Sequence, residues 1–183
     1  MNDFQTRRPS PAAVYSEFSH ALFATDDRKA AGELLGITLR KVRSEARISH
    51  TTLSKMAKIS RNKVAKAESA GFLLDSERGA MLFSKISRGL GLETEQISEL
   101  LKPYLNHTDD NLRNQMRRAR IANGMTLGEL ARQVNMKRWH LRVIELKEIK
   151  HGIQLENIVA LELSEALRID PMPIKELLRP SLP

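Results

Sequence analysis

The second half of the chain repeats the apolar pattern of the first half at a constant spacing. The shift that places Leu53 on Leu130 also places Glu68 on Glu145, and the aliphatic positions stay in register, without a gap, to the end of both copies. Self-similarity at one fixed spacing is typical of a chain built from copies of one structural unit. A chain of 183 residues has room for two small cores. The repeat therefore predicts two related domains.

Each copy has the spacing of short helices. Its apolar residues recur every three or four positions, and no stretch alternates as a strand would. In the second copy Asn111 is expected to cap the first helix, and Gly124 to end it with a positive φ. Thr126 and Glu129 then form a capping box on the next helix. An aromatic content of 4% also favours helices over a β-sandwich. We predict an all-α fold with about five helices per copy, and the matching caps in the first copy are Ser49 and Ser60.

The segments outside the repeat are short. The stretch 10–23 is expected to form a helix that carries four apolar residues on one side, namely Val14, Phe18, Leu22 and Phe23. This helix either packs on the first domain, which we favour, or provides a dimer contact. The predicted parts of the chain are an N-terminal extension over 1–34, a first domain over 35–101, a linker over 102–110, a second domain over 111–178 and a tail over 179–183.

The stretch RRARIANGMTLGELARQVNMKRWHLRVIE in the second copy resembles the helix-turn-helix of the phage-repressor-like (Cro/cI, or XRE) DNA-binding family. The family pattern is met in type and spacing by Arg120, Gly124, Thr126, Leu130, Ala131, Met136, Leu141 and Glu145. The first copy diverges, with Arg47 where the family has glycine and Ser54 where it has alanine, but it keeps Arg43, Ser49, Leu53, Ile59, Val64 and Glu68. The resemblance implies two tandem five-helix lambda-repressor-like helix-turn-helix domains behind an N-terminal helical extension.

Two arginine–glutamate pairs are assigned to the structure of the domains. Arg43 and Glu68 have the same separation along the chain as Arg120 and Glu145. In the family such a pair ties the first helix to the end of the third. Breaking one side of a partly buried pair costs about 3–5 kcal/mol. These residues are therefore excluded from the binding surface.

The resemblance also implies a recognition helix, which places its N-terminal residues against base edges in the major groove. Arginine and lysine suit guanine there, and asparagine suits adenine. A formal net charge of +8 fits a polyanionic partner, although a solvated basic face would show the same charge. Phosphate contacts are expected at the helix N-termini at Ser49 and Thr126, and His50 could add a hydrogen bond. The expected groove-facing residues are Lys137, Arg138, His140 and Arg142 in the second copy, and Arg61, Asn62, Lys63 and Lys66 in the first.

The single tryptophan, Trp139, aligns with Asn62 and should therefore face outward. An exposed tryptophan suggests a contact. Three interpretations stay open: a thymine methyl or sugar of DNA, another protein, or the domain's own surface.

The leading hypothesis is a sequence-specific, double-stranded-DNA-binding transcriptional regulator, with repression favoured by the resemblance. The alternative is a protein-interaction module, antitoxin-like or an anti-activator, that uses the same scaffold.

No enzyme activity, metal, cofactor or small-molecule site is expected, because the chain has no cysteine, no glycine-rich phosphate loop and no histidines at metal-ligand spacing. A homodimer or a protein partner is left open. No signal peptide or membrane span is expected, which places the protein in the cytoplasm, on the nucleoid when bound. A linker of about ten residues reaches about 35 Å, close to one turn of DNA.

Overall fold

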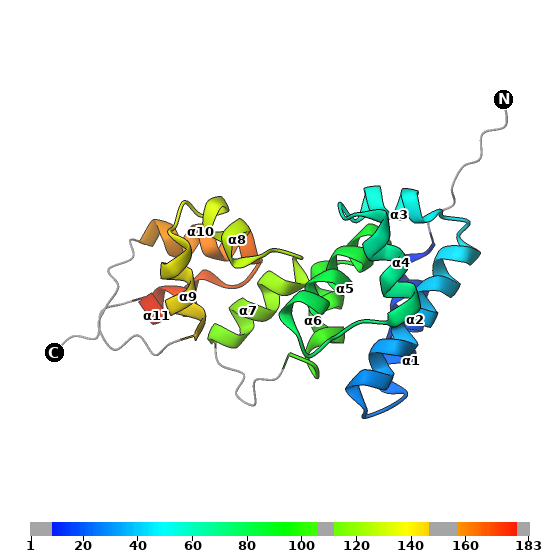
Figure 1. Cartoon of the computed structure of the whole chain (residues 1–183). Coiled ribbons are helices and arrows are strands. Elements are labelled where there is room, and N and C mark those ends of the chain that lie inside the picture. Colours follow the sequence, from blue (N-terminus) through cyan, green and yellow to red (C-terminus); the bar gives the residue numbers. More distant parts are fainter. Residues whose placement is uncertain (1–8, 106–111, 147–156, 179–183) are drawn as a thin grey trace. The chain divides into compact units, whose positions relative to one another are not determined.

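The computed structural model describes residues 9–105, 112–146 and 157–178. These residues form helices joined by turns, and none of them lies in a strand (Figure 1). The all-α class is therefore confirmed for this part of the chain. The chain divides into two compact units, Met1–Asn106 and His107–Pro183, here called unit 1 and unit 2.

Unit 1 contains the first six helices. Several of them begin at side-chain caps that satisfy free backbone N–H groups: Asp27 accepts from the N–H of Lys29, and Ser49 accepts from that of Thr52. Ser60 occupies the expected cap position, but its side chain makes no capping bond. The helices are α1 (Pro11–Phe23), α2 (Arg28–Glu45), α3 (His50–Met56), α4 (Arg61–Ala70), α5 (Glu77–Gly89) and α6 (Thr94–Leu101).

Unit 2 contains α7 (Leu112–Ala122), α8 (Leu127–Gln133), α9 (Arg138–Leu146), α10 (Asn157–Leu167) and α11 (Pro171–Leu178). The predicted capping box is confirmed: Thr126 accepts from the N–H of Glu129, whose carboxylate accepts from the N–H of Thr126. Asn111, the other predicted cap, lies outside the described residues. The core is aliphatic, as expected, and its fully buried members include Met116, Leu130, Leu141, Ile144, Leu163 and Ile174.

The repeat in the sequence is also a repeat of backbone conformation. Under the shift that aligns the two copies, α3 coincides with α8 and α6 with α11 at both ends, and α4 begins where α9 begins. The same helices pack together in both units, with α4 against α2 and α3, and α9 against α7 and α8. The residues with a positive φ also correspond: Arg47 (55°) with Gly124 (65°), and Lys58 (52°) with Asn135 (47°). The expectation for Gly124 is confirmed.

The N-terminal helix packs on unit 1, which was the favoured alternative. α1 lies against α2 and α6 (Figure 1) and buries Val14, Phe18 and Leu22. The ring of Phe18 lies 5.4 Å from that of Phe83, measured between centroids. The assignment of Phe23 to this side was wrong, because its side chain is 59% exposed. Residue 23 lies a further 100° around the helix from residue 22 and so points past the edge of the buried stripe.

Two predicted boundaries need correction. α2 begins at Arg28, so the boundary between 34 and 35 falls inside one continuous helix. Within it, a Cβ at Gly32 would lie 2.0 Å from the carbonyl oxygen of Phe72, so the helix depends on glycine there for its contact with the chain after α4. The predicted linker also begins too early, because Tyr104 and Leu105 are buried in unit 1 and the Tyr104 hydroxyl donates to the carbonyl of Leu22.

Candidate nucleic-acid interface

In each unit, two short helices meet at a tight turn that presents the start of the second helix. A backbone hydrogen bond spans the turn, from Ile59 N–H to the Ser54 carbonyl in unit 1 (3.0 Å) and from Met136 N–H to the Ala131 carbonyl in unit 2 (2.8 Å). Ser54 and Ala131 are both buried, as a close crossing of the two helices requires. The serine departs from the family pattern without leaving a polar group unpaired, because its hydroxyl donates to the carbonyl of Thr51. Both turns therefore hold the second helix in the same way.

A buried ion pair locks the far end of that second helix in unit 2. The Arg120 guanidinium donates from Nε and Nη2 to the two carboxylate oxygens of Glu145, at 2.7 and 2.8 Å. Its Nη1 donates to the carbonyl of Met125 at 2.9 Å. The side chains are 1% and 3% exposed. The predicted pairing is confirmed, and these residues are structural.

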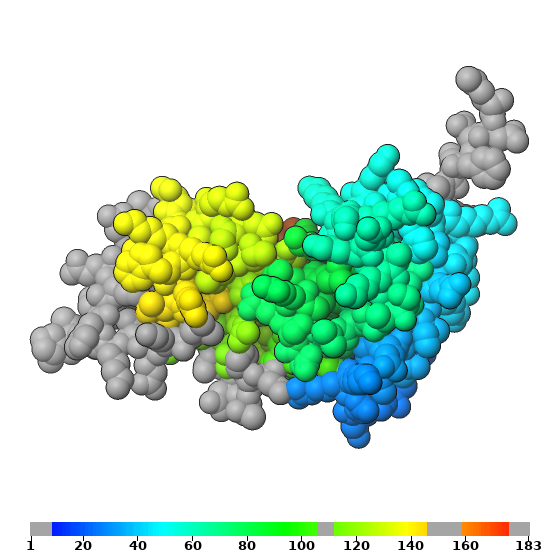
Figure 2. All heavy atoms as spheres, viewed as in Figure 1, coloured from blue at the N-terminus to red at the C-terminus, as the bar shows by residue number. Residues whose placement is uncertain are grey.

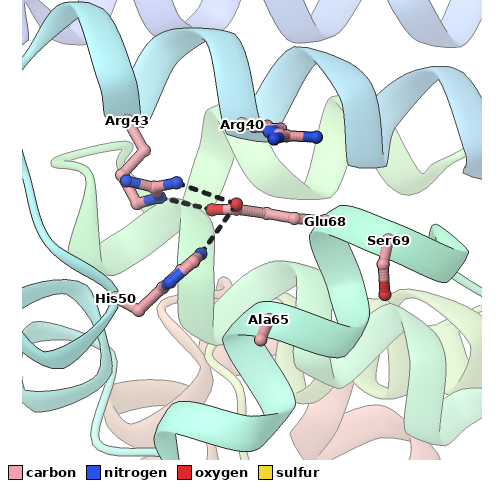
Figure 3. Close-up of a pocket in the computed structure, with 6 residues that line it drawn as sticks. All are labelled: Arg40, Arg43, His50, Ala65, Glu68 and Ser69. Atoms are coloured by element: carbon pink, nitrogen blue, oxygen red, sulfur yellow. Dashed lines mark hydrogen bonds and ion pairs between the residues drawn. The ribbon is translucent and has the colours of Figure 1, made fainter.

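Unit 1 has the same pair with an additional partner. Nε and Nη2 of Arg43 lie 2.5 and 2.9 Å from the Glu68 carboxylate oxygens, and its Nη1 donates to the Ile48 carbonyl. His50 Nε2 lies 2.8 Å from Glu68 Oε2, and Figure 3 shows Arg43 and His50 converging on this carboxylate. Burial raises the pKa of Glu68, but the hydrogen bonds and charges of Arg43 and His50 outweigh it and leave that pKa below its ordinary value. Glu68 is therefore held as a carboxylate.

The position of His50 was not anticipated from the sequence. It was expected to hydrogen-bond a phosphate, yet its Nε2 is engaged with Glu68. Leu127 occupies the equivalent position in unit 2, so the repeat gave no hint of a polar partner. A pocket of about 230 Å³ opens beside this cluster, between α2 and α4 (Figure 3), and is lined by Arg40, Arg43, His50, Ala65, Glu68 and Ser69.

The start of α4 is polar and faces solvent. Val64 and Ala67 turn inward and are buried. The four predicted groove-facing residues lie on the remaining surface, and all are exposed: Arg61, Asn62, Lys63 and Lys66. Three cationic side chains and one amide thus lie on the first two turns of this helix. In Figure 2 the side chains of α3 and α4, coloured cyan to teal, lie on the solvent-facing surface of unit 1.

The start of α9 is also exposed but carries aromatic rings. Lys137, Arg138 and Arg142 are exposed, and His140 is half-buried. Trp139 is 57% exposed, as the repeat predicted, and its ring centroid lies 3.7 Å from that of His140. The yellow surface of unit 2 in Figure 2 includes α9.

The two predicted phosphate-binding N-termini differ. Ser49 and Thr126 are both exposed caps. In unit 2 the Glu129 carboxylate lies 2.6 Å from the Thr126 backbone nitrogen and so places a negative charge at the start of α8. In unit 1 the equivalent residue is Thr52, whose hydroxyl bonds that of Ser49 at 2.9 Å. Since an anion is favoured by the helix dipole but repelled by a carboxylate, the N-terminus at Ser49 suits a phosphate better.

Comparison of the chain with protein-family models, with curated proteins and with solved structures found no match. Among the described residues, no helix is long and apolar enough to cross a membrane. The same residues contain no group of three or more histidines and carboxylates placed to hold a metal ion.

Proposed function

We propose that the protein is a sequence-specific, double-stranded-DNA-binding transcriptional regulator. In this proposal α3–α4 and α8–α9 are its helix-turn-helix motifs, and α4 and α9 are the recognition helices. The observation that carries the proposal is the equivalent, exposed start of these two helices, where arginine, lysine, asparagine and histidine side chains gather. A helix that enters the major groove contacts base edges with its N-terminal residues.

The support of these helices suits such a role. A side chain that reads a base must be held in one orientation, which requires a rigid scaffold. In unit 2 the helix is fixed at its start by the turn at Ala131 and near its end by the ion pair at Glu145. The net charge of +8 supplies the sequence-independent attraction to phosphates.

Both motifs lie on one chain, which favours adjacent half-sites. Because Leu105 is still buried in unit 1 and α7 begins at Leu112, the six residues between them reach at most about 25 Å rather than the 35 Å first expected. Tethering two modules by a short connection raises the effective concentration of the second module at its site. Repression is the favoured outcome of binding, as the resemblance to the phage-repressor-like family implies.

The alternative function is a protein-interaction module on the same scaffold, antitoxin-like or an anti-activator. Its support is Trp139, a large and mostly exposed ring of the kind that anchors protein interfaces. Recovery of no shared motif from a random duplex library would favour this alternative.

Selection of bound fragments from a random duplex library, at about 150 mM salt, tests the proposal. We expect one recurrent motif with wild-type protein. The double variant Lys137→Ala, Arg138→Ala should bind that motif at least tenfold more weakly, because each base contact is worth about 1–3 kcal/mol. The matched control is Lys29→Ala, Lys102→Ala, which removes two exposed charges from the first turn of α2 and the end of α6. Equal loss in both variants, or fragments without a shared motif, would refute sequence-specific recognition.

A further inference from the structure

The two proposed recognition helices can be compared position by position. Each begins with the same backbone hydrogen bond, from Lys63 N–H to the Ser60 carbonyl and from His140 N–H to the Lys137 carbonyl, both 3.0 Å. The residues that turn inward also correspond, because Val64 and Leu141 are both fully buried. Residues at the same position, counted from the start of each helix, therefore point in equivalent directions on α4 and α9.

The first residue is the same in both helices. Arg61 and Arg138 are each the first residue of their helix, and both are exposed. An arginine at a base edge pairs with O6 and N7 of guanine. If α4 and α9 enter the groove in the same way, each meets a guanine at the same place.

The second and sixth residues of the two helices, which form one stripe along the side of each helix, differ in chemistry. Residues four apart lie one above the other on a helix, so Asn62 and Lys66 share one side of α4, and Trp139 and Val143 share the equivalent side of α9. Asn62 and Lys66 are exposed hydrogen-bond donors. Trp139 is exposed and Val143 half-buried. The valine side chain is apolar, and the indole carries a single N–H donor on an otherwise apolar ring. One helix presents an amide and an ammonium group where the other presents mainly apolar surface.

We propose that the two units read unequal half-sites, which makes the target a composite, non-repeating sequence. This inference rests on the proposed function. Unit 1 reads a guanine followed by purines, with the Asn62 amide on adenine N6 and N7 and Lys66 on guanine. Unit 2 reads a guanine followed by thymine, whose 5-methyl group packs on Trp139 and Val143. The major groove distinguishes these bases, because only thymine offers a methyl group there and only purines offer N7.

Removing the thymine methyl group tests directly whether unit 2 recognises thymine through it. Duplexes recovered by selection are resynthesised with deoxyuridine in place of thymidine, in one half-site at a time, which deletes only the methyl. Affinity should fall about fourfold per contacted thymine in the unit 2 half-site, the effect of removing one buried methyl-sized group. It should not change in the unit 1 half-site. Trp139→Ala should reduce the difference between thymidine and deoxyuridine, because Val143 alone then contacts the methyl group, and Lys29→Ala serves as the control.

A transplant tests the inequality itself. The variant Asn62→Trp, Lys66→Val gives α4 the stripe of α9 at exposed positions, where the fold is not at stake. Selection with this variant should recover two like half-sites, both sensitive to deoxyuridine. Recovery of two identical half-sites by the wild-type protein, or no effect of deoxyuridine, overturns the inference and leaves the proposed function standing. Recovery of no motif overturns both, and Trp139 is then assigned to a protein partner.

Discussion

Replacing Glu145 with alanine should destabilise unit 2 severely. The substitution leaves the Arg120 guanidinium buried, with an exposed fraction of 1%, and removes the acceptors of two of its hydrogen bonds. The hydrogen bond from Nη1 to the Met125 carbonyl does not depend on Glu145 and is retained. Breaking a buried pair in this way costs about 3–5 kcal/mol. Domains of this size are stable by about 5–15 kcal/mol, so the loss is a large part of the total.

The equivalent change in unit 1 should cost less. Glu68→Ala exposes a guanidinium that water already reaches, since the Arg43 side chain is 13% exposed. The cost of Glu68→Ala should be close to that of losing hydrogen bonds to a charged group, about 1.5–3 kcal/mol. The contrast between Glu145→Ala and Glu68→Ala therefore compares two equivalent pairs that differ in the burial of the arginine and in the contact of His50 with Glu68.

Urea unfolding provides the assay. Trp139 is the chain's one tryptophan and lies on α9, so fluorescence reports unit 2, while circular dichroism reports both units. Glu165→Ala is the matched control, because it removes a carboxylate from an exposed position of α10. A fluorescence transition shifted by less than about 1 kcal/mol in Glu145→Ala, or shifted equally by Glu165→Ala, would refute the reasoning. The double variant Arg120→Leu, Glu145→Leu should lose less than the sum of its single changes, because no charge is then left unpaired.

Three further predictions concern backbone and charge. Arg47→Gly should stabilise unit 1 by about 1 kcal/mol in urea unfolding, because Arg47 holds a φ of 55° that costs a side chain about that much. Gly32→Ala should lower the melting temperature, since its Cβ would overlap the Phe72 carbonyl; Gly128→Ala, with nothing within 4 Å of its Cβ in helix α8, should raise it by the equivalent of about 0.5–1 kcal/mol. Glu68 has a lowered pKa in the folded protein, so its stabilisation is complete above the unfolded carboxyl pKa of about 4.3 and is lost as the pH falls below it. Glu68→Gln should therefore be less stable than wild type at pH 7, with the gap closing in unfolding curves recorded towards pH 3.

Much of the candidate site could be predicted from local spacing. The exposure of Trp139 followed from its alignment with Asn62, and the capping box at Thr126 from a glutamate three residues later. The pairing of Arg120 with Glu145 came from the family resemblance and was then found in the geometry. In each case the residues lie within one helix, or at a separation that both copies share.

Other features of the site depend on which surfaces meet. His50 and Glu68 lie on different helices, and nothing in the spacing of either indicates that they touch. The capping box was visible in the sequence, but its effect, a carboxylate at the start of α8 where a phosphate was expected, follows from the position of the Glu129 side chain. Each of these contacts occurs in one unit and has no equivalent in the other, so the two units differ in structure where their sequences are aligned.

The sequence by itself determined the helical class, its repetition in the second copy and the caps at Ser49 and Thr126, because these depend on the backbone hydrogen bonds and apolar spacing of neighbouring residues. Only the tertiary structure decided where a unit ends. Tyr104 and Leu105 were predicted to lie in the linker but are buried. Phe23 was predicted to lie on the apolar side of its helix but is exposed. The physical reason is that burial requires two surfaces in contact, because a side chain is removed from water only when another element covers it. Which element covers it is decided by the packing of the whole unit.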